Sequence, residues 1–178
     1  GGWGSGDAGT GILAITLDSA PPPPAEPGDE CADALMAYDG DNAVDTTLMT
    51  GGEVAVACDY GGFFTGCGND VWYTYTAAAD GFLTVSLCDA AGFDTDMAFW
   101  DGCPADGGTM LACSGDASSN AGPCQAYYSE INLFAVSAGQ VILIEVGGYG
   151  GVTGTNNMSI QLDSSAPTGS CCLGVENC

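Results

Sequence analysis

The chain has 178 residues, 46% of them hydrophobic, which is enough apolar material for one packed domain. It carries 23 Asp and Glu residues but no Lys, Arg or His, so its formal net charge is −23. This composition excludes binding of nucleic acid or anionic membranes through basic side chains, catalysis by Lys or His, and His-ligated metals.

Taken in chain order, the predicted elements begin with a glycine-rich segment, an alternating apolar strand and a stiff proline-rich run at residues 20–28 (APPPPAEPG). Residues 30–38 (ECADALMAY) have the pattern of a short helix. Residues 71–77 (VWYTYTA) and 82–88 (FLTVSLC) alternate around Gly81, which predicts a hairpin. Further strands are predicted at residues 97–100, 109–113, 131–137 and 141–146.

These short strands are separated by Gly, Asp and Ser residues, and residues 138–139 supply a tight turn between the last two of them. The pattern predicts an all-β fold, an antiparallel jelly-roll-like β-sandwich.

The cysteines are even in number and spread along the chain, which favours disulfides over a zinc site built from thiolates. Disulfides place the protein outside the cytoplasm. The chain shows no signal peptide, initiator Met or transmembrane run, as expected of mature secreted material. The cysteines predicted to pair are Cys31, Cys58, Cys67, Cys88, Cys103, Cys113, Cys124, Cys171, Cys172 and Cys178.

An internal repeat links the two ends of the chain. Residues 1–21 (GGWGSGDAGTGILAITLDSAP) match residues 147–167 (GGYGGVTGTNNMSIQLDSSAP) with a one-residue gap in each direction. The chain therefore opens with a second copy of its own last strand. The predicted segments are a terminal strand (1–19), a Pro-rich linker (20–29), the sandwich domain (30–163) and a Cys-rich tail (164–178).

Three arrangements would explain the repeated strand. The chain is one period of a longer tandem array, or residues 1–19 are a donor strand that pairs with a neighbouring molecule. Alternatively, the first strand pairs within its own domain. The residues predicted to form the assembly interface are Trp3, Ile12, Leu13, Ile15, Leu17 and Tyr149.

Several runs of the sequence resemble a repeated domain of secreted bacterial proteins. They are residues 29–34 (DECADA), 69–77 (NDVWYTYTA), 83–88 (LTVSLC), 94–103 (DTDMAFWDGC), 111–113 (LAC) and 136–148 (VSAGQVILIEVGG). Together they resemble the bacterial pre-peptidase C-terminal-like domain over about residues 29–163. The resemblance implies a jelly-roll-like sandwich and an extracellular module without catalytic residues.

The sequence departs from this family at two places. Ser114-Gly115-Asp116 follows Cys113 where the family commonly has an Asn-Asp-Asp string, and Phe99-Trp100 stands where a Val-Tyr pair is usual. The first departure weakens any acidic cation site carried over from the family.

Two acidic sets are candidate Ca²⁺ ligands. Asp39 and Asp41 belong to a DGDN run, whereas Asp94, Asp96 and Asp101 surround a predicted strand. Ca²⁺ takes about six to eight oxygen ligands, and such loops supply carboxylate and carbonyl oxygens together. The alternative is that these Asp residues accept backbone N–H bonds in Asx-turns. Ca²⁺ is the one cofactor predicted.

Aromatic residues in loops give a second kind of candidate site. Trp3, Tyr127, Tyr128 and Tyr149 lie in predicted loops, where aromatic rings can stack on sugars. Packing against a neighbouring unit is the alternative, since Trp3 and Tyr149 occupy equivalent places in the repeat. No catalytic residue is predicted, because neither an Asp-Thr-Gly nor an Asp-Ser-Gly triplet occurs.

The sequence thus predicts an extracellular structural protein that assembles with copies of itself into a filament or surface layer. In this mechanism, residues 9–18 occupy in an adjacent unit the place that residues 154–163 occupy in their own domain. Residues 21–24 set the spacing between units. The alternative is a non-catalytic carbohydrate- or cell-surface-binding module of a large secreted protein. Nucleic acid and membrane insertion are excluded as partners.

Overall fold

The structure, a computed structural model, describes residues 25–51, 67–88, 92–117, 124 and 127–164. Its strands are β1 (Leu35–Met36), β2 (Gly40–Asp45), β3 (Gly68–Thr76), β4 (Gly81–Ser86), β5 (Thr95–Trp100), β6 (Met110–Ser114), β7 (Glu130–Val136), β8 (Val141–Gly148) and β9 (Thr155–Asp163). Short 3₁₀ helices are η1 (Cys31–Asp33), η2 (Pro104–Asp106) and η4 (Tyr149–Gly151). Within these residues no helix is long and apolar enough to cross a membrane.

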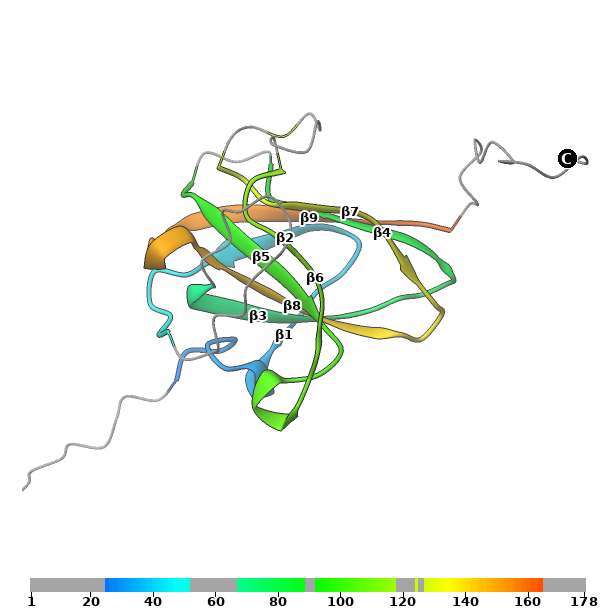
Figure 1. The fold of residues 1–178 in the computed structure, drawn as a ribbon, viewed down its shortest axis with the longest axis horizontal. Coiled ribbons are helices and arrows are strands. Elements are labelled where there is room, and N and C mark those ends of the chain that lie inside the picture. The colour runs from blue at the N-terminus through cyan, green and yellow to red at the C-terminus, as the bar shows by residue number, and fades with distance from the viewer. Residues whose placement is uncertain (1–24, 52–66, 89–91, 118–123, 125–126, 165–178) are drawn as a thin grey trace, which may run out of the picture.

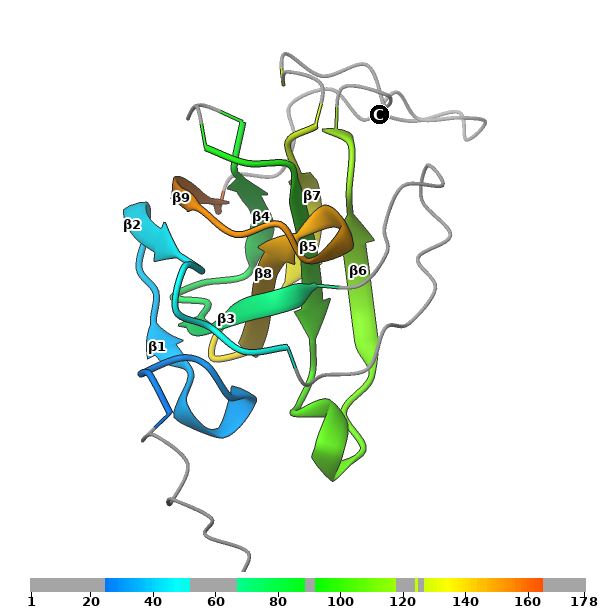
Figure 2. The same ribbon diagram turned by 90° about the vertical axis from the view of Figure 1, so that its left-hand side faces the viewer.

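The strands form two sheets that pack against each other (Figure 1). Sheet A has the strand order β1-β3-β8-β5-β6, and sheet B has the order β2-β9-β4-β7 (Figure 2). All pairings are antiparallel except the short parallel contact between β1 and β3. The predicted all-β sandwich is confirmed.

Apolar side chains from both sheets fill the space between the layers. All residues of β5 are buried, with Met97 and Phe99 in the main core and Ala98 and Trp100 in a smaller cluster. Phe99 meets Phe134 of β7 edge-on, with 5.4 Å between ring centroids. Burial of this apolar surface is the main stabilising contribution to the fold.

The helix predicted at residues 30–38 is wrong. Only Cys31–Asp33 are helical, and β1 follows directly. Leu35 and Met36 pair with β3, and the Ala37 N–H donates to the Thr74 carbonyl at 2.9 Å. This pairing with a buried strand outweighs the local helical preference of the segment.

The hairpin predicted from residues 71–77 and 82–88 is also wrong, although both strands exist. β3 pairs with β1 and β8 in sheet A, whereas β4 pairs with β7 and β9 in sheet B. The same applies to β7 and β8, which also lie in different sheets on either side of the predicted turn at residues 138–139.

Both of these connections cross between the sheets at one corner of the sandwich. There the Gly139 N–H donates to the Ala77 carbonyl at 2.8 Å, and the Ala77 N–H donates to the Gln140 carbonyl at 2.9 Å. The Ala138 N–H donates to the Asp80 carboxylate at 2.8 Å. The two connections therefore hold each other, which explains why neither closes a hairpin.

Two tyrosines of β3 reach towards sheet B. The Tyr73 hydroxyl donates to the Ala43 carbonyl of β2 at 2.7 Å, and the Tyr75 hydroxyl donates to the Asp39 carboxylate at 2.8 Å. Burial raises the pKa of both phenols well above its usual range, and the Asp39 carboxylate adds to the shift for Tyr75. These bonds fix the edge of sheet B to sheet A.

We expect the protein to lose stability at alkaline pH. Because the pKa of Tyr73 is raised in the folded state, the unfolded chain releases the phenol proton at a lower pH. The contribution of Tyr73 to the free energy of unfolding is therefore complete below about pH 10 and declines above it. The expected loss is about 1.4 kcal/mol per pH unit for this residue. Urea unfolding at about pH 8 and pH 11 measures it. Tyr73→Phe is expected to show a smaller loss, and an equal loss in both proteins would contradict this account.

The outer face of sheet A is covered by the segment before β1. The Trp72 N–H of β3 donates to the Gly28 carbonyl at 2.8 Å. Asp29, the last residue of the predicted linker, is buried and accepts hydrogen bonds from Thr50. A disulfide then joins Cys31 to Cys103. The folded unit therefore includes the last residues of the predicted linker.

Candidate functional site

The N-terminal repeat, residues 1–21, duplicates the sequence of β9, a strand in the middle of sheet B. Its pairing with β2 runs from Ile160 opposite Gly40 to Thr155 opposite Asp45. Its pairing with β4 runs from Asp163 opposite Phe82 to Ser159 opposite Ser86. Both backbone edges of β9 are therefore hydrogen-bonded to neighbouring strands. The place of β9 between β2 and β4 is called the β9 position below.

The side chains of β9 divide between the core and the solvent. Met158 and Ile160 are 0% and 2% exposed, and Leu162 packs against the same core. Ser159 and Gln161 face the solvent. A strand in this position thus needs apolar residues at every second place.

The start of β9 is fixed by a glycine. An ideal Cβ on Gly154 would lie 2.6 Å from Cδ1 of the buried Phe93 ring, so a larger residue would displace that ring. The Thr46 N–H donates to the Gly154 carbonyl at 2.9 Å, and the Gly154 N–H donates to the Thr46 hydroxyl at 3.0 Å. The chain therefore enters the β9 position through a tight backbone contact.

Most of the predicted assembly residues lie outside the described part of the chain. These are Trp3, Ile12, Leu13, Ile15 and Leu17. Tyr149 is described: it opens η4 and is 39% exposed. Its N–H donates to the Asp94 carbonyl at 3.0 Å, which attaches η4 to the start of β5.

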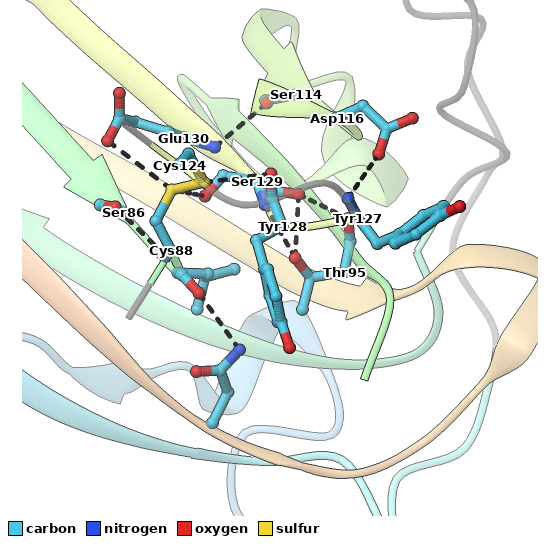
Figure 3. Close-up of a disulfide and its surroundings, with 12 residues drawn as sticks. Ser86, Cys88, Thr95, Ser114, Asp116, Cys124, Tyr127, Tyr128, Ser129 and Glu130 are labelled. Atoms are coloured by element: carbon cyan, nitrogen blue, oxygen red, sulfur yellow. Dashed lines mark hydrogen bonds between the residues drawn. A yellow bond between two sulfur atoms is a disulfide. The ribbon is translucent and has the colours of Figure 1, made fainter. Parts of the chain in front are cut away.

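Tyr127 lies at the same end of the sandwich as Tyr149. Its carbonyl accepts from the Thr95 N–H at 3.0 Å, its own N–H donates to the Asp116 carboxylate at 3.0 Å, and its side chain is 63% exposed (Figure 3). Tyr128, the other predicted loop aromatic, is half-buried. Two exposed tyrosines therefore flank the start of β5.

A buried hydroxyl network supports this end. The Ser129 N–H donates to the Thr95 hydroxyl at 2.9 Å, and the Ser129 hydroxyl donates to the Thr95 carbonyl at 2.5 Å. The Glu130 N–H donates to the Ser114 hydroxyl at 3.1 Å beside the Cys88–Cys124 disulfide (Figure 3). Buried polar groups that are all satisfied rigidify their surroundings.

The two predicted Ca²⁺ ligands of the DGDN run are split between a strand and the connection before it. Gly40–Asp45 form β2, so Asp41 belongs to a strand and pairs with Ser159. Asp39 precedes the strand and accepts from Tyr75. Both carboxylates are on exposed residues.

The second predicted set is dispersed along β5. Asp96 is fully buried within the strand, whereas Asp101 follows it, is exposed and accepts from the Thr109 N–H at 2.6 Å. Burial raises the pKa of Asp94, and the charge of Asp116 adds to the shift. Across residues 25–51, 67–88, 92–117, 124 and 127–164, no group of three or more Cys, Asp or Glu side chains is placed to hold a metal ion.

A buried acidic group on sheet A was not predicted from the sequence. Asp70, Asp96 and Glu145 are each at most 3% exposed, and Glu145 accepts from the Trp100 indole N–H at 2.7 Å. The chain has no basic side chain to neutralise them. Glu145 is a single acidic residue within an apolar run (VILIEVGG), and this was the signal available in the sequence.

The cysteines differ in part from the prediction. Cys31–Cys103 and Cys88–Cys124 are disulfides, and Cys113 is also disulfide-bonded. Cys67 is instead a buried free thiol that packs against Gly147. Burial raises the pKa of this thiol, and the charges of Glu145, Asp96 and Asp70 raise it further. The remaining cysteines, Cys58, Cys171, Cys172 and Cys178, lie outside the described residues.

Comparison with known proteins identifies no family for this chain. No protein-family model and no curated protein matches it. A solved structure, that of the Podospora anserina GH26-CBM35 β-(1,4)-mannanase, matches with 12% sequence identity and a TM-score of 0.32. The match covers 74% of this chain and 29% of the mannanase chain, so this chain spans less than a third of that protein. The likeness to pre-peptidase C-terminal-like domains stays a prediction.

Proposed function

We propose that this protein is an extracellular structural protein, a subunit or repeat of a filament or surface assembly whose successive units are joined by β-strand complementation. The observation that carries the proposal is the second copy of the β9 sequence. Aligned without gaps, residues 9–19 and 154–164 are identical at six places, which are Gly9, Thr10, Ile15, Leu17, Asp18 and Ser19 in the first copy.

The described sandwich supplies a reason for the first copy to act outside its own domain. The β9 position of the chain is already filled by Thr155–Asp163, which pairs with both neighbouring strands. An additional strand of the same pattern therefore has no second place of that kind in the described sheets. In a neighbouring unit, the strand would take the place of that unit's own residues 155–163.

The composition suits an extracellular assembly. Disulfides persist in oxidising compartments. Main-chain hydrogen bonds join strands without ionic contacts, which this chain cannot form between its side chains. Because units of net charge −23 repel each other, Ca²⁺ bound by surface carboxylates would strengthen the joint.

The proposal is tested by comparing the full chain with a chain that begins at residue 20. Light scattering over a range of concentrations measures their masses. We expect the full chain to form multimers that grow with concentration, and the shortened chain to remain a folded monomer, since every described strand follows residue 34. A monomeric full chain, or equal assembly of both chains, would overturn the proposal.

Carbohydrate binding is the second candidate, favoured by the two exposed tyrosines at the start of β5. Tyr127 and Tyr149 are bonded to the backbone of Thr95 and Asp94, which places them on either side of the start of β5. Titration calorimetry with neutral oligosaccharides tests this function. A monomeric chain that binds a sugar, and loses binding on Tyr127→Ala, would establish it in place of assembly.

A further inference from the structure

We infer that Tyr127, Tyr149, Asp94 and Asp116 form a binding site for an amino sugar, the unit of an extracellular polysaccharide that carries a protonated amine. These four residues are called the tyrosine–carboxylate site below. The inference rests on carbohydrate binding, the second candidate function, and names the class of sugar. It does not depend on assembly of the chain.

The four residues come from separate segments that meet at the start of β5. The Tyr149 N–H donates to the Asp94 carbonyl at 3.0 Å, and the Thr95 N–H donates to the Tyr127 carbonyl at 3.0 Å. Tyr127 in turn donates its own N–H to the Asp116 carboxylate at 3.0 Å. Each tyrosine is therefore held by its backbone next to one of the two acidic residues.

The backbone of Tyr127 adopts a conformation that large side chains rarely take. Its φ is +73°, in the left-handed region where Gly, Asn and Asp are the usual residues. The side chain is 63% exposed and points away from the buried Ser129–Thr95 network, so burial of the ring does not offset the strain (Figure 3). The bond to Asp116 holds the conformation instead. Strain that the surroundings maintain at an exposed aromatic residue is typical of a functional position.

The two acidic residues prepare the site for a positive charge. Both are half-buried. Burial raises the pKa of Asp94, and the negative charge of Asp116 raises it further, so the two carboxyl groups repel each other when both are ionised. No Lys, Arg or His side chain exists in the chain to neutralise them. A cation bound beside both would relieve the repulsion.

An amino sugar has groups that match both parts of the site. Its ammonium group donates charge-assisted hydrogen bonds to carboxylates and is attracted to the faces of tyrosine rings. The apolar face of its sugar ring can stack on the same rings. The net charge of −23 attracts cationic ligands and repels anionic ones, whereas a neutral sugar gains nothing from it. These four residues therefore favour an amino sugar over a neutral or acidic one.

Titration calorimetry of the full chain with two matched probes tests the inference. The probes are oligomers of glucosamine and of N-acetylglucosamine, which share the sugar ring but differ in the charged amine. The titrations are made at low ionic strength and mildly acidic pH, where the amine is protonated. We expect the glucosamine oligomer to bind at least about tenfold more tightly, because acetylation removes the charge-assisted hydrogen bond. We also expect added salt to weaken its binding.

Two double variants that remove the same charge locate the binding. Asp94→Asn/Asp116→Asn changes the site, and Asn at position 116 can still accept the Tyr127 N–H. Asp101→Asn/Asp106→Asn is the matched control, because both residues are exposed and follow the far end of β5. We expect the first variant to lose at least about tenfold in affinity for the glucosamine oligomer, and the second to bind like the parent. Tyr127→Asn removes the ring with a residue that tolerates a positive φ, and is expected to weaken binding of both probes.

Four results would contradict the inference. Equal binding of the two oligomers, unchanged in Asp94→Asn/Asp116→Asn, would overturn the amino-sugar site and leave carbohydrate binding in place. An equal loss in both double variants would mean that the net charge alone attracts the ligand. An oligolysine of equal charge that binds as tightly would assign the site to a cationic peptide in place of a sugar. If neither sugar oligomer binds, the carbohydrate function and this inference fail together.

Discussion

Replacing Ile15 by Asp is expected to abolish assembly while leaving the sandwich folded. Ile15 aligns with Ile160, which is 2% exposed and paired with Val85 in the core of sheet B. A charged carboxylate at this place would be buried without a counter-charge, at a cost of several kcal/mol, on the order of a 100-fold or greater loss in association. The chain's own β9 keeps its Ile160, so the monomer is unaffected.

The matched control is Thr16→Asp, one residue along the same strand. Thr16 aligns with Gln161, which faces the solvent, so this variant adds the same charge on the outer side of the joint. We expect it to assemble close to the parent. Light scattering measures both variants, and circular dichroism checks their folds. If both variants fail to assemble, the added charge matters but the side of the strand that carries it does not. If both assemble like the parent, Ile15 is not buried in the joint.

Removal of the Cys31–Cys103 disulfide is expected to cause a large loss of stability. The bond joins residues 72 apart in the sequence and fixes the segment before β1 across the outer face of sheet A. From the loss of chain entropy in the unfolded state, a disulfide that closes a loop of this length is expected to stabilise the fold by about 4 kcal/mol. That is a large share of the roughly 5–15 kcal/mol that a domain of this kind has in total.

Cys31→Ala/Cys103→Ala is therefore compared with Cys67→Ala by urea unfolding. Cys67 is a buried free thiol, so its removal deletes a sulfur atom without opening a loop. We expect this control to lose about 1 kcal/mol of unfolding free energy, as for a small truncation in the core. If the double variant loses no more than the control, the cross-link does not stabilise the fold as argued.

The strands were the most predictable part of the fold, because alternation marks a half-buried strand directly. β5, β6, β7, β8 and β9 begin and end within two residues of their predicted ranges. Alternation says nothing about which sheet a strand joins, and so β3 and β4 were paired wrongly. That choice is made at the corner, where Ala77 bonds to Gly139 and Gln140, residues distant in the sequence.

The acidic residues show a second limit of sequence reasoning. The DGDN run has the composition of a loop, yet Gly40, Asp41 and Asn42 form the first half of β2, because β9 supplies backbone partners for them. Asp70 and Glu145 are placed inside by the strands that carry them, and a short-range pattern gives no sign of that for Asp70. The match between residues 9–19 and β9, by contrast, was visible in the sequence, and the structure adds which of its side chains face inward.

Negative-stain electron microscopy of the native full chain, with and without a Ca²⁺ chelator, tests the central claim most directly. We expect uniform filaments or sheets with a regular repeat, and shorter or fewer ones after chelation if Ca²⁺ bridges the units. Single particles in both conditions would contradict assembly by strand complementation and would favour the binding module instead.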